Sequence, residues 1–302
     1  MTGFSCNNNC IFCSNNNRQH DRSTEQIIAD VGRSVSRGAT CEGVEFIGGE
    51  AAIRDDIFIL LNEVKKKGIK NIRLTSNGRI FSYPEHVKKL VDAGLNQLHI
   101  SLYGSSPKVH NAITRTRGSF KQTVAGIDNA KKEKKLKLTI NTVICKYNLE
   151  SLKDLAKFLI KKKIKYWNIL DLLPDGRAKQ LYKYLKFDYQ EFGRALKDMK
   201  EEIKSFQEVC FVDFPYCVIP EEIRKMKNIN YLNADERYKG MKQVGYKDIS
   251  RMSKKNKQGK VLYKDKYRKH LKFCDDCSYI ESCGGVSKAY LKDSEFVIKR
   301  YK

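Results

Sequence analysis

Short apolar runs alternate with amphipathic helical patterns through the first 175 residues of this chain. The runs are rich in Ile, Leu, Val or Thr and predict strands at 43–48, 70–76, 96–102, 137–144 and 165–172. Helical patterns fill the intervals at 24–37, 57–67, 84–93, 120–134 and 149–163. Repeated strand–helix units require parallel strands joined by right-handed crossovers. The alternation therefore predicts an α/β fold.

Six such units fit if residues 1–5 form the end of a first strand. Six units predict a partial (β/α)6 TIM-type barrel rather than the full eight-stranded one. We expect this barrel to occupy residues 1–187. Residues 188–302 are expected to form a further helix, a strand near 209–214 and a small second region with a basic insertion. In such barrels the chemistry takes place at the carboxyl ends of the strands.

Three cysteines lie within eight positions close to the start of the chain. Cys6, Cys10 and Cys13 have the spacing C-x3-C-x2-C. A [4Fe–4S] cluster held by three thiolates keeps one iron open for chemistry. Zinc is the alternative, but it needs a fourth ligand, and only the poorly spaced His20 is near. The triplet therefore indicates a reactive iron–sulfur centre.

The triplet, with Phe12 before its third cysteine, resembles the signature of the radical S-adenosylmethionine (radical SAM) enzymes. The sequence Gly48-Gly49-Glu50 after a predicted strand resembles that superfamily's second motif. The resemblance implies that the open iron binds S-adenosylmethionine and that one electron cleaves it to a 5′-deoxyadenosyl radical. It also implies a reductant protein of the flavodoxin or ferredoxin type as a partner.

The same resemblance implies further cofactor contacts at the ends of later strands. The segment Leu172-Leu173-Pro174 resembles the segment that packs on adenine, and Arg115 is a candidate partner for the cofactor carboxylate, with Arg117 as the alternative. The positions with this expected role are Gly48, Gly49, Glu50, Ser76, Asn77, Ser101, Arg115, Asn141 and Leu173.

A second cysteine group, Cys274, Cys277 and Cys283, has the spacing C-x2-C-x5-C. A zinc half-site is one interpretation of such spacing. The spacing also resembles the auxiliary extensions called SPASM and twitch domains, although Ser287 stands where a full SPASM motif has another cysteine. The resemblance implies a second, auxiliary [4Fe–4S] cluster. Its fourth ligand is expected to be Cys217, with Cys210 as the alternative.

The chain has ten cysteines and a net charge of +24. It shows no signal peptide and no apolar run that could span a bilayer, so we expect a reducing cytoplasmic setting without membrane contact. The positive charge favours RNA or an acidic peptide as a partner. Heavy use of Lys, Asn and Ile is equally expected from a compositional bias of the coding sequence.

Three functions follow from these patterns. The first is a maturase that modifies a ribosomally made peptide, with recognition supplied by a separate protein. The second is an enzyme acting on RNA or on a small molecule derived from a nucleotide. The third is an electron carrier with two iron–sulfur clusters, which the Gly48-Gly49-Glu50 motif disfavours because a carrier needs no cofactor cradle.

Overall fold

The structure is a computed structural model, and it describes residues 1–15, 21–36, 43–232, 253–255, 261–263, 267–294 and 296. Much of the basic insertion lies outside the described residues, so the expectation placed on it is not addressed by the structure.

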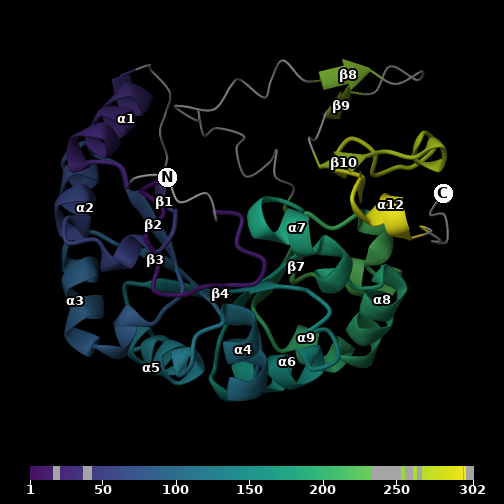
Figure 1. Cartoon of the computed structure of the whole chain (residues 1–302), viewed down its shortest axis with the longest axis horizontal. Coiled ribbons are helices and arrows are strands. Elements are labelled where there is room, and N and C mark those ends of the chain that lie inside the picture. The colour runs from purple at the N-terminus through teal and green to yellow at the C-terminus, as the bar shows by residue number, and fades with distance from the viewer. Residues whose placement is uncertain are drawn as a thin grey trace.

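Seven parallel strands form one sheet in which the spatial order is the chain order. The sheet curls into a half-barrel (Figure 1). Its strands are β1 (Gly43–Phe46), β2 (Asn71–Ser76), β3 (Gln97–Ser101), β4 (Lys137–Val143), β5 (Tyr166–Leu170), β6 (Glu208–Val212) and β7 (Ile229–Leu232). The predicted α/β partial barrel is confirmed, because sequential parallel pairing with helical crossovers is what the alternation requires.

The number of strands differs from the prediction at both ends of the sheet. Residues 1–5 do not form a strand; Thr2 donates its N–H to the carbonyl of Ile47 at 2.7 Å, so this segment lies against the end of β1. At the other end β6 and β7 extend the sheet beyond residue 187. β7 escaped prediction because its four residues are only partly buried and show no clean alternation.

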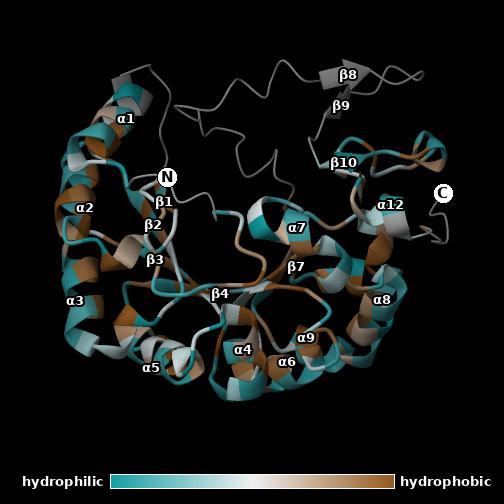
Figure 2. Ribbon diagram, viewed as in Figure 1, coloured by the Kyte–Doolittle hydropathy of each residue, from teal (hydrophilic) through white to brown (hydrophobic). Residues whose placement is uncertain are grey.

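Helices form an arc around the outer face of the sheet (Figure 1). Each carries both hydrophobic and hydrophilic residues, as is typical of amphipathic helices that pack against a sheet (Figure 2). The larger helices are α1 (Thr24–Ser36), α2 (Ile57–Lys66), α3 (Pro84–Asp92), α4 (Pro107–Thr114), α5 (Ser119–Ala130), α6 (Leu152–Lys161), α7 (Gly176–Leu185), α8 (Tyr189–Asp198) and α9 (Lys200–Lys204). Among the described residues, no helix is long and apolar enough to cross a membrane.

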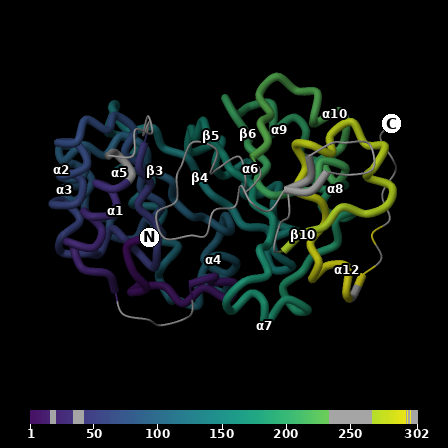
Figure 3. Tube along the Cα trace, turned by 90° about the horizontal axis from the view of Figure 1, so that it is seen from above, coloured from purple at the N-terminus to yellow at the C-terminus, as the bar shows by residue number. Residues whose placement is uncertain are grey.

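The C-terminal region packs beside the last strands of the sheet, away from α1–α3 (Figure 3). It contains the short strands β10 (Arg268–Lys269) and β11 (Val286–Ser287), which pair antiparallel, and the helix α12 (Tyr290–Asp293). Two further strands, β8 (Ser253–Lys255) and β9 (Val261–Tyr263), pair with each other. α10 (Glu221–Arg224) precedes β7.

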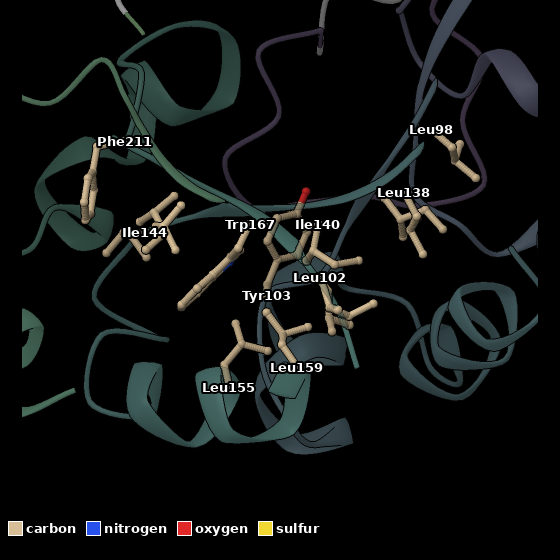
Figure 4. Packing of buried hydrophobic residues seen from close by; sticks show 14 of the residues in the cluster. Leu98, Leu102, Tyr103, Leu138, Ile140, Ile144, Leu155, Leu159, Trp167 and Phe211 are labelled. Carbon is tan, nitrogen blue, oxygen red and sulfur yellow. The ribbon is translucent and has the colours of Figure 1, made fainter. Parts of the chain in front are cut away.

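The hydrophobic core lies between the outer face of the sheet and the helices. Every second residue of β3, β4 and β5 points into it, including Leu98, Ile140 and Trp167 (Figure 4). Trp167 is fully buried and donates its indole N–H to the Thr142 hydroxyl at 2.9 Å. Leu155 and Leu159 of α6 pack below the sheet in the same cluster (Figure 4).

The intervening residues point to the inner face, which is polar. Ser101, Asn141, Asn168, Cys210 and Asn230 are register partners across five adjacent strands, β3 to β7. Asn168 donates its side-chain N–H to the Asn141 amide oxygen at 2.9 Å. The row begins at Ser101, the carboxyl end of β3, and crosses β5, β6 and β7 nearer the middle of each strand. The carboxyl ends form the functional edge of such a barrel.

Replacing Leu159 by Ala should lower the free energy of unfolding by about 2–5 kcal/mol, because the side chain is fully buried and its removal leaves a cavity. The measurement is urea unfolding followed by the fluorescence of Trp167, the only tryptophan of the chain. The exposed neighbour Lys161→Ala is the control and should change stability by less than about 0.5 kcal/mol. Equal effects of both substitutions would contradict this packing.

Candidate functional site

The segment with Cys6, Cys10 and Cys13 lies on the carboxyl edge of the sheet, held by backbone groups that follow β1. Gly49 donates its N–H to the Gly3 carbonyl at 2.8 Å, and Glu50 donates to the Ser5 carbonyl at 2.7 Å. A Cβ on Gly49 would overlap the carbonyl oxygens of Phe4 and Ser5. The two segments of the chain approach each other so closely that this position requires glycine.

The other end of the cysteine segment is held by residues that follow β3 and β5. Asn9 and Ile11 donate their N–H groups to the carbonyls of Thr114 and Ile113, at 3.0 and 2.9 Å. Arg177, in the first turn of α7, donates its side-chain N–H to the carbonyls of Asn9 at 2.9 Å and Cys10 at 2.5 Å. Its backbone N–H donates to the Cys13 carbonyl at 2.9 Å.

Residues after β2 supply a third support. Asn77 donates its side-chain N–H to the Asn7 amide oxygen at 2.6 Å and approaches the Cys6 Sγ at 3.9 Å. Arg79 donates to the Asn7 carbonyl and to the Asn8 side chain. The Arg79 side chain is itself held in place, because its Nε donates to the Gln122 side-chain oxygen at 2.7 Å. The three thiols are thus carried by a segment whose backbone is anchored to the ends of four strands.

The three thiols lie close enough to act on one another electrostatically. Burial, and then the neighbouring Cys6 and Cys13, raise the pKa of Cys10 to about 12. Burial also raises the pKa of Cys6, while the N–H of Asn8, 3.4 Å from its Sγ, opposes that effect. A metal centre that binds thiolates would relieve the repulsion.

The carboxylate of Glu50 is bound by backbone N–H groups of the protein itself. It is fully buried; one oxygen accepts from the Ala52 N–H at 3.1 Å and the other from the Asn77 N–H at 2.6 Å. Burial raises its pKa, and the two N–H donors oppose that shift. Glu50 therefore joins the end of β1 to the end of β2 and fixes the shape of the edge on which the cysteines lie.

The remaining predicted cofactor contacts have different surroundings. The Ser76 hydroxyl is buried and accepts from the Gly78 N–H at 2.9 Å, whereas Ser101 and Asn141 lie half-buried on the inner face. Arg115 is exposed and takes a left-handed backbone conformation, φ +51°, directly after α4. Arg117 is exposed as well. Leu173 is half-buried just after β5, ahead of Arg177.

The second cysteine group gathers residues from two distant parts of the chain. Cys217 follows β6, and its pKa is raised to about 12 by burial and then by Cys283, Cys274 and Cys277. Burial raises the pKa of Cys274 to about 11, and the Leu271 N–H, 3.4 Å from its Sγ, opposes the shift. The Gly285 N–H lies 3.4 Å from the Cys283 Sγ. The structure thus brings Cys217 together with the C-terminal triplet.

Cys210 and Cys145 have other surroundings. Cys210 lies within β6, opposite Asn168 in register, and is buried. Cys145 is fully buried after β4, and burial raises its pKa to about 12.

The thiol spacing bears on which metal centre fits. In the part of the chain that the structure describes, no three His, Cys, Asp or Glu side chains come close enough to hold one metal ion. An iron–sulfur cluster binds its cysteines through separate irons, and N–H groups directed at the sulfurs are typical of its surroundings. The donor sets of both groups fit this chemistry.

Sequence reasoning missed Arg79 and Arg177. Neither belongs to a recognisable motif, and each comes into contact with the cysteine segment only because the fold brings distant parts of the chain together. The one available signal was position, because both follow predicted strands at the carboxyl edge.

Comparison with known proteins agrees with this geometry. Residues 2–159 match the model of the radical SAM superfamily. A probable GTP 3′,8-cyclase of Sulfurisphaera tokodaii is 28% identical over 204 residues, which is 66% of this chain and 63% of that protein. The chain therefore spans less than two thirds of that relative's length.

Two solved structures share the fold over almost the whole chain. Streptococcus suis SuiB bound to the precursor peptide SuiA has a TM-score of 0.60 at 17% identity, covering 97% of this chain and 72% of that one. Native anSMEcpe with bound AdoMet and the Kp18Cys peptide has a TM-score of 0.63 at 15% identity, covering 98% and 91%.

Replacing Arg177 by Met should weaken retention of iron by the first cysteine group by about 10–100-fold, because supports of metal ligands contribute that much to affinity. The loss follows from the two carbonyls of the cysteine segment that its guanidinium holds. The measurement is iron content after anaerobic reconstitution and exposure to a chelator. Arg194→Met, on the exposed face of α8, is the matched control. Iron loss at the same rate in both variants would contradict this role.

Proposed function

Because the chain belongs to the radical SAM superfamily, we propose that it is an enzyme whose first cysteine group, Cys6, Cys10 and Cys13, holds a [4Fe–4S] cluster. When bound, that cluster would supply the electron that cleaves S-adenosylmethionine to methionine and a 5′-deoxyadenosyl radical, which abstracts hydrogen from a substrate. The protein's own contribution is to hold the cysteine segment rigid and to shape the edge of the sheet beside it.

We assign the cofactor contacts on the same basis. Gly48 and Gly49 let the backbone approach S-adenosylmethionine closely, and Glu50 and Asn77 shape that part of the edge through their hydrogen bonds. Ser101 and Asn141 face the inner side, where they can bind its polar groups. Arg115 offers a cation to its carboxylate, and Leu173 an apolar surface to its adenine.

The second cysteine group is proposed to hold an auxiliary [4Fe–4S] cluster, with Cys217 as the fourth ligand beside Cys274, Cys277 and Cys283. The support is their electrostatic proximity in the structure. A flavodoxin- or ferredoxin-type protein would supply the electrons.

The proposed substrate is a ribosomally made peptide. The observation that carries this proposal is the row Ser101, Asn141, Asn168, Cys210 and Asn230 on the inner face, which is polar but uncharged. Amide and hydroxyl groups match the hydrogen-bonding groups of a peptide backbone. A triphosphate calls instead for clustered cations. Arg73 and Lys137 of this face are both register partners of Gln97, the first residue of β3, and Arg73 is bound by Gln97 at 2.8 Å. At the carboxyl edge, Arg79 and Arg177 already bind carbonyls of the cysteine segment.

A second candidate substrate is a nucleotide or a molecule derived from one. It is favoured by the sequence similarity to the GTP 3′,8-cyclase, a likeness that leaves about a third of this chain uncovered. The fold likeness to the two peptide-bound enzymes extends over the C-terminal region as well, which supports the peptide.

Serine substitutions at Cys217 and Cys210 separate the two candidate ligands of the auxiliary cluster. Anaerobic reconstitution of the wild type should give roughly eight irons per chain, four for each cluster. Cys217→Ser should lower the count toward roughly four, whereas Cys210→Ser, its matched control, should keep roughly eight. The reverse pattern would transfer the ligand role to Cys210.

The substrate test measures 5′-deoxyadenosine formed by the reconstituted enzyme with S-adenosylmethionine and dithionite. Short peptides encoded beside its gene should raise the yield, and GTP should leave it unchanged. Cys10→Ala should form none, because the cluster loses one of its three thiolates. Asn230→Leu should lower the increase given by the peptide while background cleavage continues, since Asn230 lies on β7, at the far end of the row from Ser101 and Asn141. An increase given by GTP alone would overturn the peptide assignment.

A further inference from the structure

Arg268 of β10 lies buried between two carboxylates of the barrel. Its side chain is 2% exposed, and its guanidinium nitrogens lie 3.0 Å from the Asp171 carboxylate and 3.5 Å from that of Asp213. Asp171 directly follows β5 and Asp213 directly follows β6, so the two acids belong to neighbouring strand ends. A residue of the C-terminal region is thereby fixed to the carboxyl edge of the sheet.

Each partner in this ion cluster is held in place. Asp171 is fully enclosed; it accepts from the Tyr189 hydroxyl at 2.8 Å and from the Leu172 N–H at 2.8 Å. Asp213 has a left-handed backbone conformation, φ +65°, which is unfavourable for most residues but tolerated by Asp and Asn. Backbone strain of this kind persists where surrounding structure fixes it, and it clusters at functional sites. Here it directs the Asp213 carboxylate at Arg268.

Arg268 also lies beside the second cysteine group. Its strand pairs with β11, where Arg268 is the register partner of Ser287. Two residues further on, the His270 ring lies 2.7 Å from the Cys283 carbonyl oxygen. A Cβ on Gly285, at φ +79°, would come within 2.5 Å of the Lys269 carbonyl oxygen, so this turn packs directly on β10.

We propose that Arg268 is a positioning residue that fixes the second cysteine group to the barrel edge, and that its charge raises the reduction potential of the group bound there. This inference rests on the proposed auxiliary cluster. Reduction adds one negative charge to an iron–sulfur centre, and a buried cation nearby stabilises the added charge. Asp171 and Asp213, whose carboxylates face the same guanidinium, oppose that effect. The ion cluster therefore sets both the place and the potential of the auxiliary centre.

The test compares three reconstituted full-length variants in potentiometric titrations followed by EPR. Arg268→Gln removes the cation and should lower the reduction potential of the auxiliary cluster. The expected change in the reduction equilibrium is at least tenfold, which corresponds to about 59 mV for one electron. Asp213→Asn keeps a residue that tolerates the left-handed conformation and removes the opposing charge, so it should raise the potential. Arg268→Lys retains the charge and should change the potential least.

Opposite shifts for Arg268→Gln and Asp213→Asn are the decisive result, because structural damage alone has no reason to move the two in opposite directions. Lys88→Gln, which removes an exposed ion pair on α3, is the control and should leave the potential unchanged. Equal potentials, or shifts of the same sign, would overturn the proposal. If Arg268→Gln fails to fold, Asp213→Asn decides alone, and an unchanged or lowered potential in that variant overturns it.

Failure of the underlying function gives a different result. If the wild type binds only roughly four irons and Cys274→Ala does not change that number, then the auxiliary cluster is absent and the proposed function is wrong in this respect. If roughly eight irons are bound and the potential does not respond to charge at 268 and 213, only the present inference fails.

Discussion

The backbone hydrogen bonds between the N-terminal segment and the ends of β1, β3 and β5 are the interactions on which the rest of the structure depends. A segment of eight residues with three cysteines has no secondary structure of its own to hold its shape. Its N–H and carbonyl groups are satisfied instead by Gly49, Glu50, Ile113, Thr114 and Arg177. Those partners stand in the loop after β1, in the last turn of α4 and in the first turn of α7, so the cysteine segment is held by the connections that follow β1, β3 and β5.

That dependence explains which parts the sequence could predict. The strands and most of the helices follow from period-2 and period-3.6 patterns, which are local, and the structure places them within a few residues of the predicted ranges. The cysteine triplet was evident because its ligands are adjacent in the chain. Cys217 and the C-terminal triplet are more than fifty residues apart, so only a resemblance to known extensions could suggest that they meet.

The supporting residues were beyond the reach of sequence patterns for the same reason. Arg79 and Arg177 act on carbonyl groups about 70 and 170 residues away, and nothing near them in the chain indicates this. Glu50 shows the opposite case. Its motif was recognisable, yet the structure turns its carboxylate inward to join two strand ends, where burial and two N–H donors fix it. A motif therefore locates a functional residue without stating how its side chain acts.

The two cysteine groups are joined by one short stretch of chain. Asp171 contacts Arg268, which stands beside Cys283, and six residues later Arg177 holds the carbonyl of Cys10. The stretch between them leaves β5 and enters α7 through Pro174, and both of its ends are held, Asp171 by Tyr189 and Arg177 by the cysteine segment. A segment this short between two fixed ends has few conformations, so it ties the supports of both groups to the end of β5. Asn141 and Asn168 of the inner-face row lie on β4 and β5. A substrate bound on that row would contact the strands that position both centres.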